Sequence, residues 1–178
     1  MAFKRLFVAL SIKERLKHSL EACRATLPIF GLAWVREENL HITVLFLGNI
    51  AEADIPAIQE KLQTLSNLKP FQLQCTHLVP VSKRGRLTML WAGFAESQEF
   101  VRFATQLASL LNHPPDHSPL PHVTLARVRK GQKVKLHENQ LPVFASHSWV
   151  VRSFGLWVSE LNPAGAKYTI LQEWELNG

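Results

Sequence analysis

The sequence predicts an α+β fold made of two pseudo-symmetric lobes, with antiparallel sheets around a central groove. Three observations support this fold class. Strand-like and helix-like stretches are mixed along the chain, each half reads strand, helix, strand, and both halves carry the same short motif. No low-complexity linker interrupts the 178 residues, so we expect one bilobal domain spanning residues 1–178.

The first half begins with an alternating stretch, residues 3–10, which predicts a strand with two different faces. Leu6, Val8 and Leu10 would share one face, with Arg5, Phe7 and Ala9 on the other. Ser11 and Glu14 then stand at capping-box spacing, which predicts the start of a helix. The apolar stripe of this helix is Leu16, Leu20, Cys23 and Leu27, and Pro28 marks its end.

A short loop containing glycine leads to the strand "LHITVLFLG", residues 40–48, which the turn signal Gly48-Asn49 should end. A second helix is expected over residues 54–65, where Ile58, Leu62 and Leu65 fall at helical spacing. Residues 71–79 alternate cleanly and predict a half-buried strand.

The second half repeats this order. Residues 86–94 read as a strand, and an apolar stripe over residues 100–111 predicts a helix. A Pro-rich loop, residues 112–121, then precedes the strand "HVTLARV", residues 122–128. Two further strands, residues 149–160 and 167–176, close the chain, and the turn between them contains Pro163 and Gly165.

The repeated motif is His-x-Thr, as His41 and Thr43 in the first half and His122 and Thr124 in the second. Side chains of a strand alternate between faces, so each histidine should share a face with its threonine. Leu45 should continue the His41 face, whereas the apolar residues Ile42, Val44 and Phe46 should point into the core. If the two strands lie side by side at a pseudo-twofold axis, both imidazoles and both hydroxyls converge on one pocket.

Such a pocket suits displacement at phosphorus without a metal. One imidazole can accept a proton from an attacking water while the other protonates a leaving oxygen. The threonine hydroxyls can hydrogen-bond non-bridging oxygens, and Arg127, five residues after His122, can clamp a phosphate. Phe7 on the first strand is a candidate for stacking a nucleobase.

Each of these residues also has a simpler interpretation. A histidine in a strand is more often a hydrogen-bonded core residue than a catalyst, although two copies of the motif favour function. Arg127 could be a solvated strand end, and Phe7 could serve only core packing. The segment from Lys130 to Lys135 is more typical of an exposed loop than of a specific site.

His113, His117 and His122 form a series that invites a zinc interpretation. The Pro-rich loop between them argues against helical ligand geometry, no cysteine is near, and Asp116 is the only local carboxylate. We therefore expect no metal site and no cofactor.

The composition is that of an ordinary globular protein, with 47% hydrophobic and 19% charged residues. The net charge of +6 suggests a polyanionic partner, usually nucleic acid, although a basic surface can also serve solubility. Cys23 and Cys75 form no disulfide framework or zinc motif, which favours a reduced, cytoplasmic protein. No stretch resembles a signal peptide or a membrane span, and we expect a monomer with no membrane partner.

The chain resembles the two-histidine phosphoesterase superfamily, and within it the bacterial and archaeal RNA 2′,3′-cyclic phosphodiesterases, also called 2′-5′ RNA ligases. The resemblance covers nearly the whole chain. It includes the opening strand "KRLFVAL", Trp34 before the first motif, the segment "RGRLTMLWAGF", the second motif "PHVTLAR" and the final hairpin "LWVSELNPAGAKYTIL".

This resemblance implies a bilobal α/β fold and metal-free hydrolysis of terminal RNA 2′,3′-cyclic phosphates to 2′-phosphates. It implies that His41, Thr43, His122 and Thr124 line the groove and that Arg127 contacts the phosphate. By analogy His122 is the base and His41 the acid, although the near symmetry of the motifs leaves this division open. The family can also join such an end to a 5′-hydroxyl in a 2′-5′ linkage.

Two other functions remain open at this stage. A non-catalytic RNA-binding module would keep the basic groove but would not need both histidines. A related phosphoesterase could instead act on a small cyclic-phosphate or 2′-5′ linked nucleotide, although the excess of Lys and Arg favours longer RNA.

Overall fold

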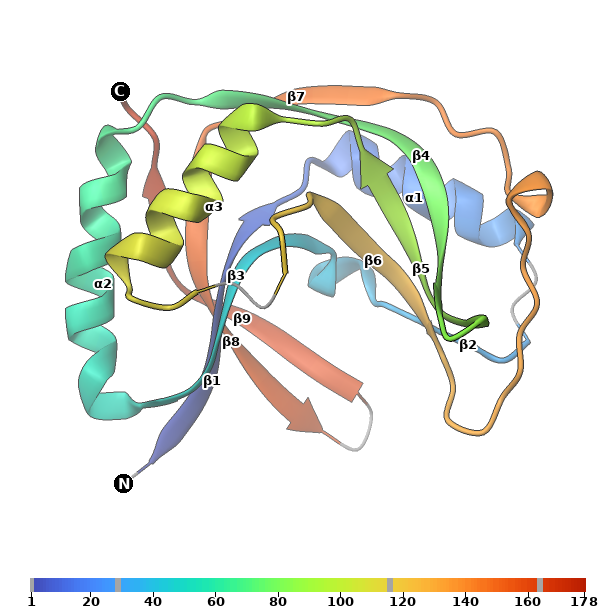
Figure 1. The fold of residues 1–178 in the computed structure, drawn as a ribbon, viewed down its shortest axis with the longest axis horizontal. Helices are drawn as coiled ribbons and strands as arrows, with labels where there is room; N and C mark the ends of the chain where they lie inside the picture. Colours follow the sequence, from blue (N-terminus) through green and yellow to red (C-terminus); the bar gives the residue numbers. More distant parts are fainter. Residues whose placement is uncertain (1, 28–29, 115–116, 163–164) are drawn as a thin grey trace.

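A computed structural model describes residues 2–27, 30–114, 117–162 and 165–178 (Figure 1). The described residues contain three α-helices and nine strands, besides four short 3-10 helices. In chain order they are β1 (Phe3–Ser11), α1 (Glu14–Thr26), β2 (Leu32–Trp34), β3 (His41–Ala51), α2 (Ile55–Gln63), β4 (Phe71–Lys83), β5 (Arg86–Phe94), α3 (Gln98–Leu110), β6 (His122–Val128), β7 (His147–Val151), β8 (Ser153–Asn162) and β9 (Gly165–Glu175).

The described strands form one curled antiparallel sheet in the order β7-β4-β5-β6-β3-β1-β8-β9, with β2 paired to β6. We call β3, β1, β8 and β9 the first arm, and β6, β5, β4 and β7 the second arm. Within each arm a motif strand is followed outward by three further strands. This arrangement confirms the predicted α+β fold of two similar lobes around a groove.

The two arms meet where β3 lies beside β6. In the described sheet, the ladder between these strands consists of one Cα pair, Ile42 with Val123. Each of these residues directly follows its motif histidine. The pseudo-twofold axis therefore passes close to both histidines, which brings residues 81 positions apart into one neighbourhood.

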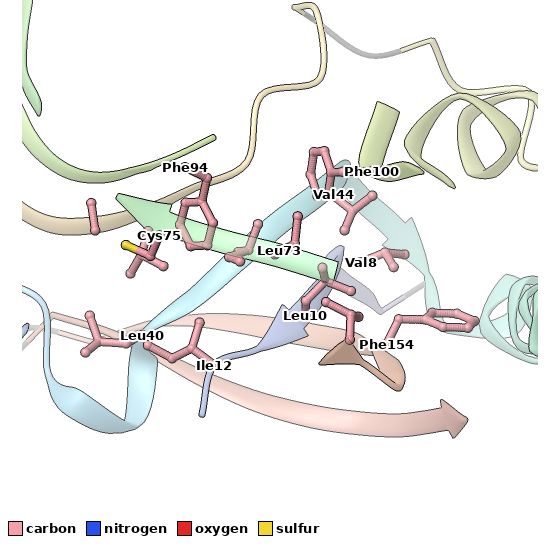
Figure 2. Packing of buried hydrophobic residues seen from close by; sticks show 14 of the residues in the cluster. Val8, Leu10, Ile12, Leu40, Val44, Leu73, Cys75, Phe94, Phe100 and Phe154 are labelled. Atoms are coloured by element: carbon pink, nitrogen blue, oxygen red, sulfur yellow. The ribbon is translucent and has the colours of Figure 1, made fainter. Parts of the chain in front are cut away.

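The core lies on the side of the sheet away from the groove and contains residues of both arms. Figure 2 shows Val8 and Leu10 of β1 in one cluster with Leu73 and Cys75 of β4 and with Phe100 of α3. Helix α3 contacts both β3 and β4. Burial of this apolar surface is the main force that holds the curled sheet in shape.

Strand β1 is buried on both faces, and its two faces pack into different clusters. Leu6, Val8 and Leu10 belong to the main core, whereas Phe7 and Ala9 pack with Trp157 of β8 on the groove side. The two faces predicted for residues 3–10 are therefore confirmed.

A β-bulge interrupts the predicted alternation in β3. Val8 pairs with Leu45 but Ala9 pairs with Thr43, so Val44 is an extra residue without a partner on β1. Such a residue shifts the alternation by one position. Val44 and Leu45 are consequently both buried, and Phe46 is 38% exposed on the groove side. The prediction that Leu45 lines the groove while Phe46 enters the core was wrong for this reason.

The predicted turn at Gly48-Asn49 is wrong, because β3 continues to Ala51. Leu6 pairs with Gly48 and Phe7 with Phe46, so a second bulge lies here instead. Gly48 has φ of +73°, a backbone conformation that glycine adopts without steric cost. Gly48 does mark an irregular backbone position, but this position is a β-bulge within the strand and not a turn at its end.

Three other local predictions need correction. Ser11 does not cap α1, because it pairs with His41 in the sheet and the helix starts after Lys13, which makes no side-chain cap. The loop before the first motif contains the short strand β2. The strand predicted over residues 149–160 is divided at Arg152 into β7 and β8, which pair with different arms. Pro28 and Pro163, expected at a helix end and in a hairpin turn, lie outside the described residues.

Candidate active site

His41 begins β3, and its ring is held by hydrogen bonds at both nitrogens. Nδ1 lies 2.7 Å from the carbonyl oxygen of Asn39, and Nε2 lies 2.9 Å from Oγ1 of Thr43. A carbonyl oxygen can only accept, so Nδ1 carries the proton. In the neutral ring Nε2 therefore accepts the hydroxyl proton of Thr43, which leaves Nε2 as the atom that exchanges a proton.

His122 begins β6 and is oriented in the same way. Its Nδ1 lies 2.9 Å from the carbonyl oxygen of Leu120, again two residues earlier in the chain. The same argument places the proton on Nδ1 and the free lone pair on Nε2. The ring of Trp91 stacks on this imidazole at a centroid distance of 3.8 Å. Each arm thus fixes one imidazole with the lone pair of its neutral form on Nε2.

Both histidines are stabilised in their neutral forms. Burial lowers the pKa of His41 to about 4, and the charges of His122 and Arg127 act in the same direction. The hydrogen bond to the Asn39 carbonyl opposes this effect. Burial, together with the charge of Arg127, also lowers the pKa of His122. A bound phosphate would favour the imidazolium forms, because a nearby opposite charge raises the pKa of a histidine.

Aromatic rings surround His41 on the first arm. The ring centroids of Phe7, Trp157 and Tyr168 lie 4.9, 5.5 and 5.1 Å from that of the imidazole. Phe7 is only 2% exposed and supports the His41 ring within this cluster. Base stacking by Phe7 stays a prediction, which the covered position of its ring disfavours.

Arg127 reaches the groove because β6 has the same bulge as β3. Leu90 pairs with Ala126 but Trp91 pairs with Thr124, so Leu125 is the extra residue. Strict alternation would place Arg127, an odd number of positions after His122, on the opposite face. The bulge returns the arginine to the groove, where its side chain is exposed and donates to Sδ of Met89 at 3.0 Å.

The structure brings all six predicted site residues together around one pocket of about 420 Å³. Its lining contains His41, Thr43, His122, Thr124, Arg127 and Phe7. It also contains residues that the sequence did not single out, among them Arg5, Asn39, Phe46 and Tyr168. Phe46 follows His41 at the same interval as Arg127 follows His122, so a comparison of the two motifs could have found it.

Asn39 links the first motif to the final hairpin. This buried side chain donates from Nδ2 to the carbonyl oxygen of Ala166 at 2.7 Å, and its Oδ1 accepts from the backbone N–H of Tyr168 at 3.1 Å. The carbonyl group of the same residue holds the ring of His41. Asn39 therefore fixes the imidazole relative to β9, and its contacts link positions too distant in sequence for a local motif to reveal.

The described residues do not place His113, His117 and His122 in a group that could share a metal ion; Asp116 lies outside them. Within the same residues, the group with suitable spacing is Glu14, His18 and Glu37, which is exposed on the surface. The described helices include none that is long and apolar enough to cross a bilayer.

The chain matches one protein family over most of its length. The family model of LigT like phosphoesterases matches residues 8–91 and 94–168. An RNA 2′,3′-cyclic phosphodiesterase of Thermus thermophilus is 32% identical, with 98% of this chain and 91% of the relative covered. The corresponding enzyme of Methanocaldococcus jannaschii is 25% identical, with 96% and 99% covered.

Solved structures show the same fold. The protein TT0787 of Thermus thermophilus superimposes with a TM-score of 0.84 at 29% identity, and 98% of each chain is covered. The E. coli LigT structure with 3′-AMP superimposes with a TM-score of 0.81 at 22% identity, with 99% of this chain and 100% of LigT covered. The resemblance inferred from the doubled motif is confirmed: the chain belongs to the family of LigT like phosphoesterases.

Proposed function

We propose that the protein hydrolyses terminal RNA 2′,3′-cyclic phosphates to 2′-phosphates by paired general acid and base catalysis, without a metal ion. The observation that carries this proposal is the matched orientation of two imidazoles in one pocket. Each ring has Nδ1 tied to a backbone carbonyl, so each offers Nε2 to the reacting atoms. The curated relatives named above carry this activity in their names.

In the proposed reaction, Nε2 of His122 takes a proton from water as the water oxygen attacks phosphorus. The bond from phosphorus to the 3′ oxygen breaks, and Nε2–H of protonated His41 donates to that leaving oxygen. A 2′-phosphate remains, and proton exchange with solvent resets both rings. Positioned groups of this kind typically contribute about 10²- to 10⁴-fold in rate.

The threonines and Arg127 bind the non-bridging oxygens in this scheme. In the neutral ring the hydroxyl of Thr43 donates to Nε2 of His41. When Nε2 is protonated and donates to the leaving oxygen, it no longer accepts from Thr43, so this hydroxyl can donate to a non-bridging oxygen. Arg127 supplies a charge-assisted contact. The same displacement with a 5′-hydroxyl as nucleophile would form a 2′-5′ linkage.

A small nucleotide is the second candidate substrate, because the pocket of about 420 Å³ lies within the size range of small-ligand sites. A non-catalytic RNA-binding module explains the geometry less well. Binding alone gives no reason for both imidazoles to be held with the proton on Nδ1 and the lone pair on Nε2.

The experiment that tests the proposal uses a short RNA ending in a 2′,3′-cyclic phosphate, incubated with the protein in excess EDTA. We expect conversion to the 2′-phosphate. A 3′-phosphate product would contradict the proposed leaving oxygen, and an unchanged RNA would contradict hydrolysis of this substrate.

A further inference from the structure

The excess positive charge of the chain is concentrated in two short segments, residues 82–86 and 127–135, which we call the basic rim. Together they contain eight of the 20 Lys and Arg residues and no Asp or Glu. The remaining 12 basic residues are outnumbered by 14 acidic ones, so the rest of the chain has a formal charge of −2. The net charge of +6 therefore originates in the basic rim.

The two segments form one surface. Met89 of β5 pairs with Arg127 of β6, and the strands run antiparallel. The start of β5 at Arg86 consequently lies beside the segment that follows β6. Lys83 pairs with Arg86 to close the β4–β5 hairpin. Figure 1 shows the hairpin turn and the loop after β6 on the same side of the molecule, at the right.

The loop after β6 is fixed to the start of β2 by hydrogen bonds and close packing. The N–H of Arg129 donates to the carbonyl oxygen of Gly31 at 2.8 Å, and Nε of the same arginine donates to that of Leu32 at 3.2 Å. Val134 lies so close to Gly31 that a Cβ at the glycine would be 2.6 Å from Cγ2 of the valine. The basic loop is therefore packed against the protein.

This packing directs the lysines toward solvent. Lys133 and Lys135 are exposed, whereas Val134 is half-buried and Leu136 is buried. The ion pairs found among the described residues all lie outside the basic rim. Its exposed cations are thus available to a polyanion.

The basic rim begins inside the catalytic pocket, because Arg127 belongs to both. A terminal cyclic phosphate leaves the RNA only one direction in which to continue, toward its 5′ side. We propose that the basic rim binds the phosphates of the nucleotides on the 5′ side of the reacting group, which makes oligonucleotides better substrates than mononucleotides. This proposal rests on the proposed function. The rim contains no aromatic residue, so its contacts should be to phosphates and independent of sequence.

The test compares two variants with the same change in charge. The rim variant replaces Lys83, Arg84, Arg86, Lys130, Lys133 and Lys135 with Gln, and keeps Arg127 and Arg129. The control variant replaces six exposed cations elsewhere with Gln, namely Lys13, Arg15, Lys61, Lys69, Arg102 and Arg152. The substrates are a single-stranded RNA of about 12 nucleotides ending in a 2′,3′-cyclic phosphate and adenosine 2′,3′-cyclic monophosphate.

We expect the ratio of kcat/KM for the oligonucleotide to that for the mononucleotide to fall at least about tenfold in the rim variant, and less than about twofold in the control. RNA affinity should also depend less on salt in the rim variant, with a log–log slope shallower by about 0.7 for each phosphate that the variant no longer neutralises. Equal behaviour of the two variants would overturn the proposal. The proposal would also be overturned if the rim variant kept its RNA affinity but no longer bound poly-glutamate. The basic rim would then be a binding site for an acidic protein.

The binding measurement keeps this proposal separate from the proposed function. If the wild-type protein hydrolyses neither substrate, the proposed function is wrong. The comparison of RNA affinity and its salt dependence between rim and control variants then still decides whether the rim binds RNA.

Discussion

Phe46 and Arg127 occupy equivalent positions in the two motif strands, each five residues after its histidine and each returned to the groove by a bulge. The two arms share this backbone but present different chemistry at the same place. An aromatic ring lies on one side of the pseudo-twofold axis and a guanidinium on the other. This difference makes the pocket asymmetric although its histidines are related by near symmetry.

Replacement of either motif histidine should remove catalysis and leave the fold intact. His41→Ala and His122→Ala should each lower kcat by about 10² to 10⁴, because each removes a positioned acid or base. The measurement is turnover of the cyclic-phosphate RNA, with thermal unfolding to verify the fold. His18→Ala, on the exposed surface of α1, is the control. Full activity in either motif variant would contradict the paired mechanism.

Arg127 should contribute through its charge and its planar geometry. Arg127→Gln should reduce kcat/KM by about 10²-fold, comparable to the loss of one preorganised transition-state donor. Arg127→Lys should recover only part of the rate, because lysine keeps the charge but cannot form a bidentate hydrogen bond to the phosphate. Arg152→Gln provides a control at an exposed arginine between β7 and β8. If the Gln variant of Arg127 matches this control, the side chain does not bind the reacting phosphate.

Asn39 should act as a positioning residue. Asn39→Ala removes two hydrogen bonds to β9 and should lower the free energy of unfolding by about 1–3 kcal/mol. It should also lower kcat, since the backbone that holds His41 loses its anchor. Gln59→Ala is the matched control, because Gln59 also bonds to β9, through Gln172 at 2.7 Å, but does not line the pocket. Denaturant unfolding and kinetics on both variants check the prediction, and an equal kcat in the two would refute the positioning role.

The depressed histidine pKa values predict how stability depends on pH. The unfolded chain binds a proton at His41 near the ordinary pKa of about 6.5, whereas the folded protein binds it only near a pKa of about 4. The stabilisation is therefore complete above about pH 6.5 and is lost as pH falls toward 4. Replacing His41 with Gln should flatten the pH dependence of unfolding free energy in this window. An unchanged slope would show that the imidazole titrates normally in the folded protein.

Inorganic phosphate gives an independent check on the same groups. Its negative charge should raise the pKa of His41 and His122 when it binds between them. NMR titration of the imidazole protons with and without phosphate measures this directly. Midpoints that do not move at saturating phosphate would place the anion elsewhere.

The sequence was sufficient to predict the lobes and the central site because both depend on local patterns. His-x-Thr in an alternating strand fixes which side chains share a face, and its repetition indicates the second half of the site. The bulges were not predictable in this way, because an unpaired residue such as Val44 looks like any other apolar strand position. For this reason Phe46 was assigned to the wrong face, and Arg127 was correctly placed in the groove without its structural cause.

Contacts between residues far apart in the sequence also could not be predicted. The three residues of β2 pair with β6, and Asn39 bonds to β9, so both depend on partners far away in the sequence. Ser11 and Glu14 had the spacing of a helix cap, but pairing of Ser11 with His41 extended the strand instead. Tertiary hydrogen bonding prevailed over a local preference in that case.

The sheet pairing between β3 and β6 consists of the single Cα pair Ile42 with Val123, and this has a mechanical consequence. If the sheet flexes at this pair, the displacement of a residue increases with its distance from the pair. The outer strands β7 and β9 would then move much more than the residues beside the pair. The two imidazoles stand beside this pivot. Such flexing would therefore change the width of the groove far more than the spacing of the two imidazoles.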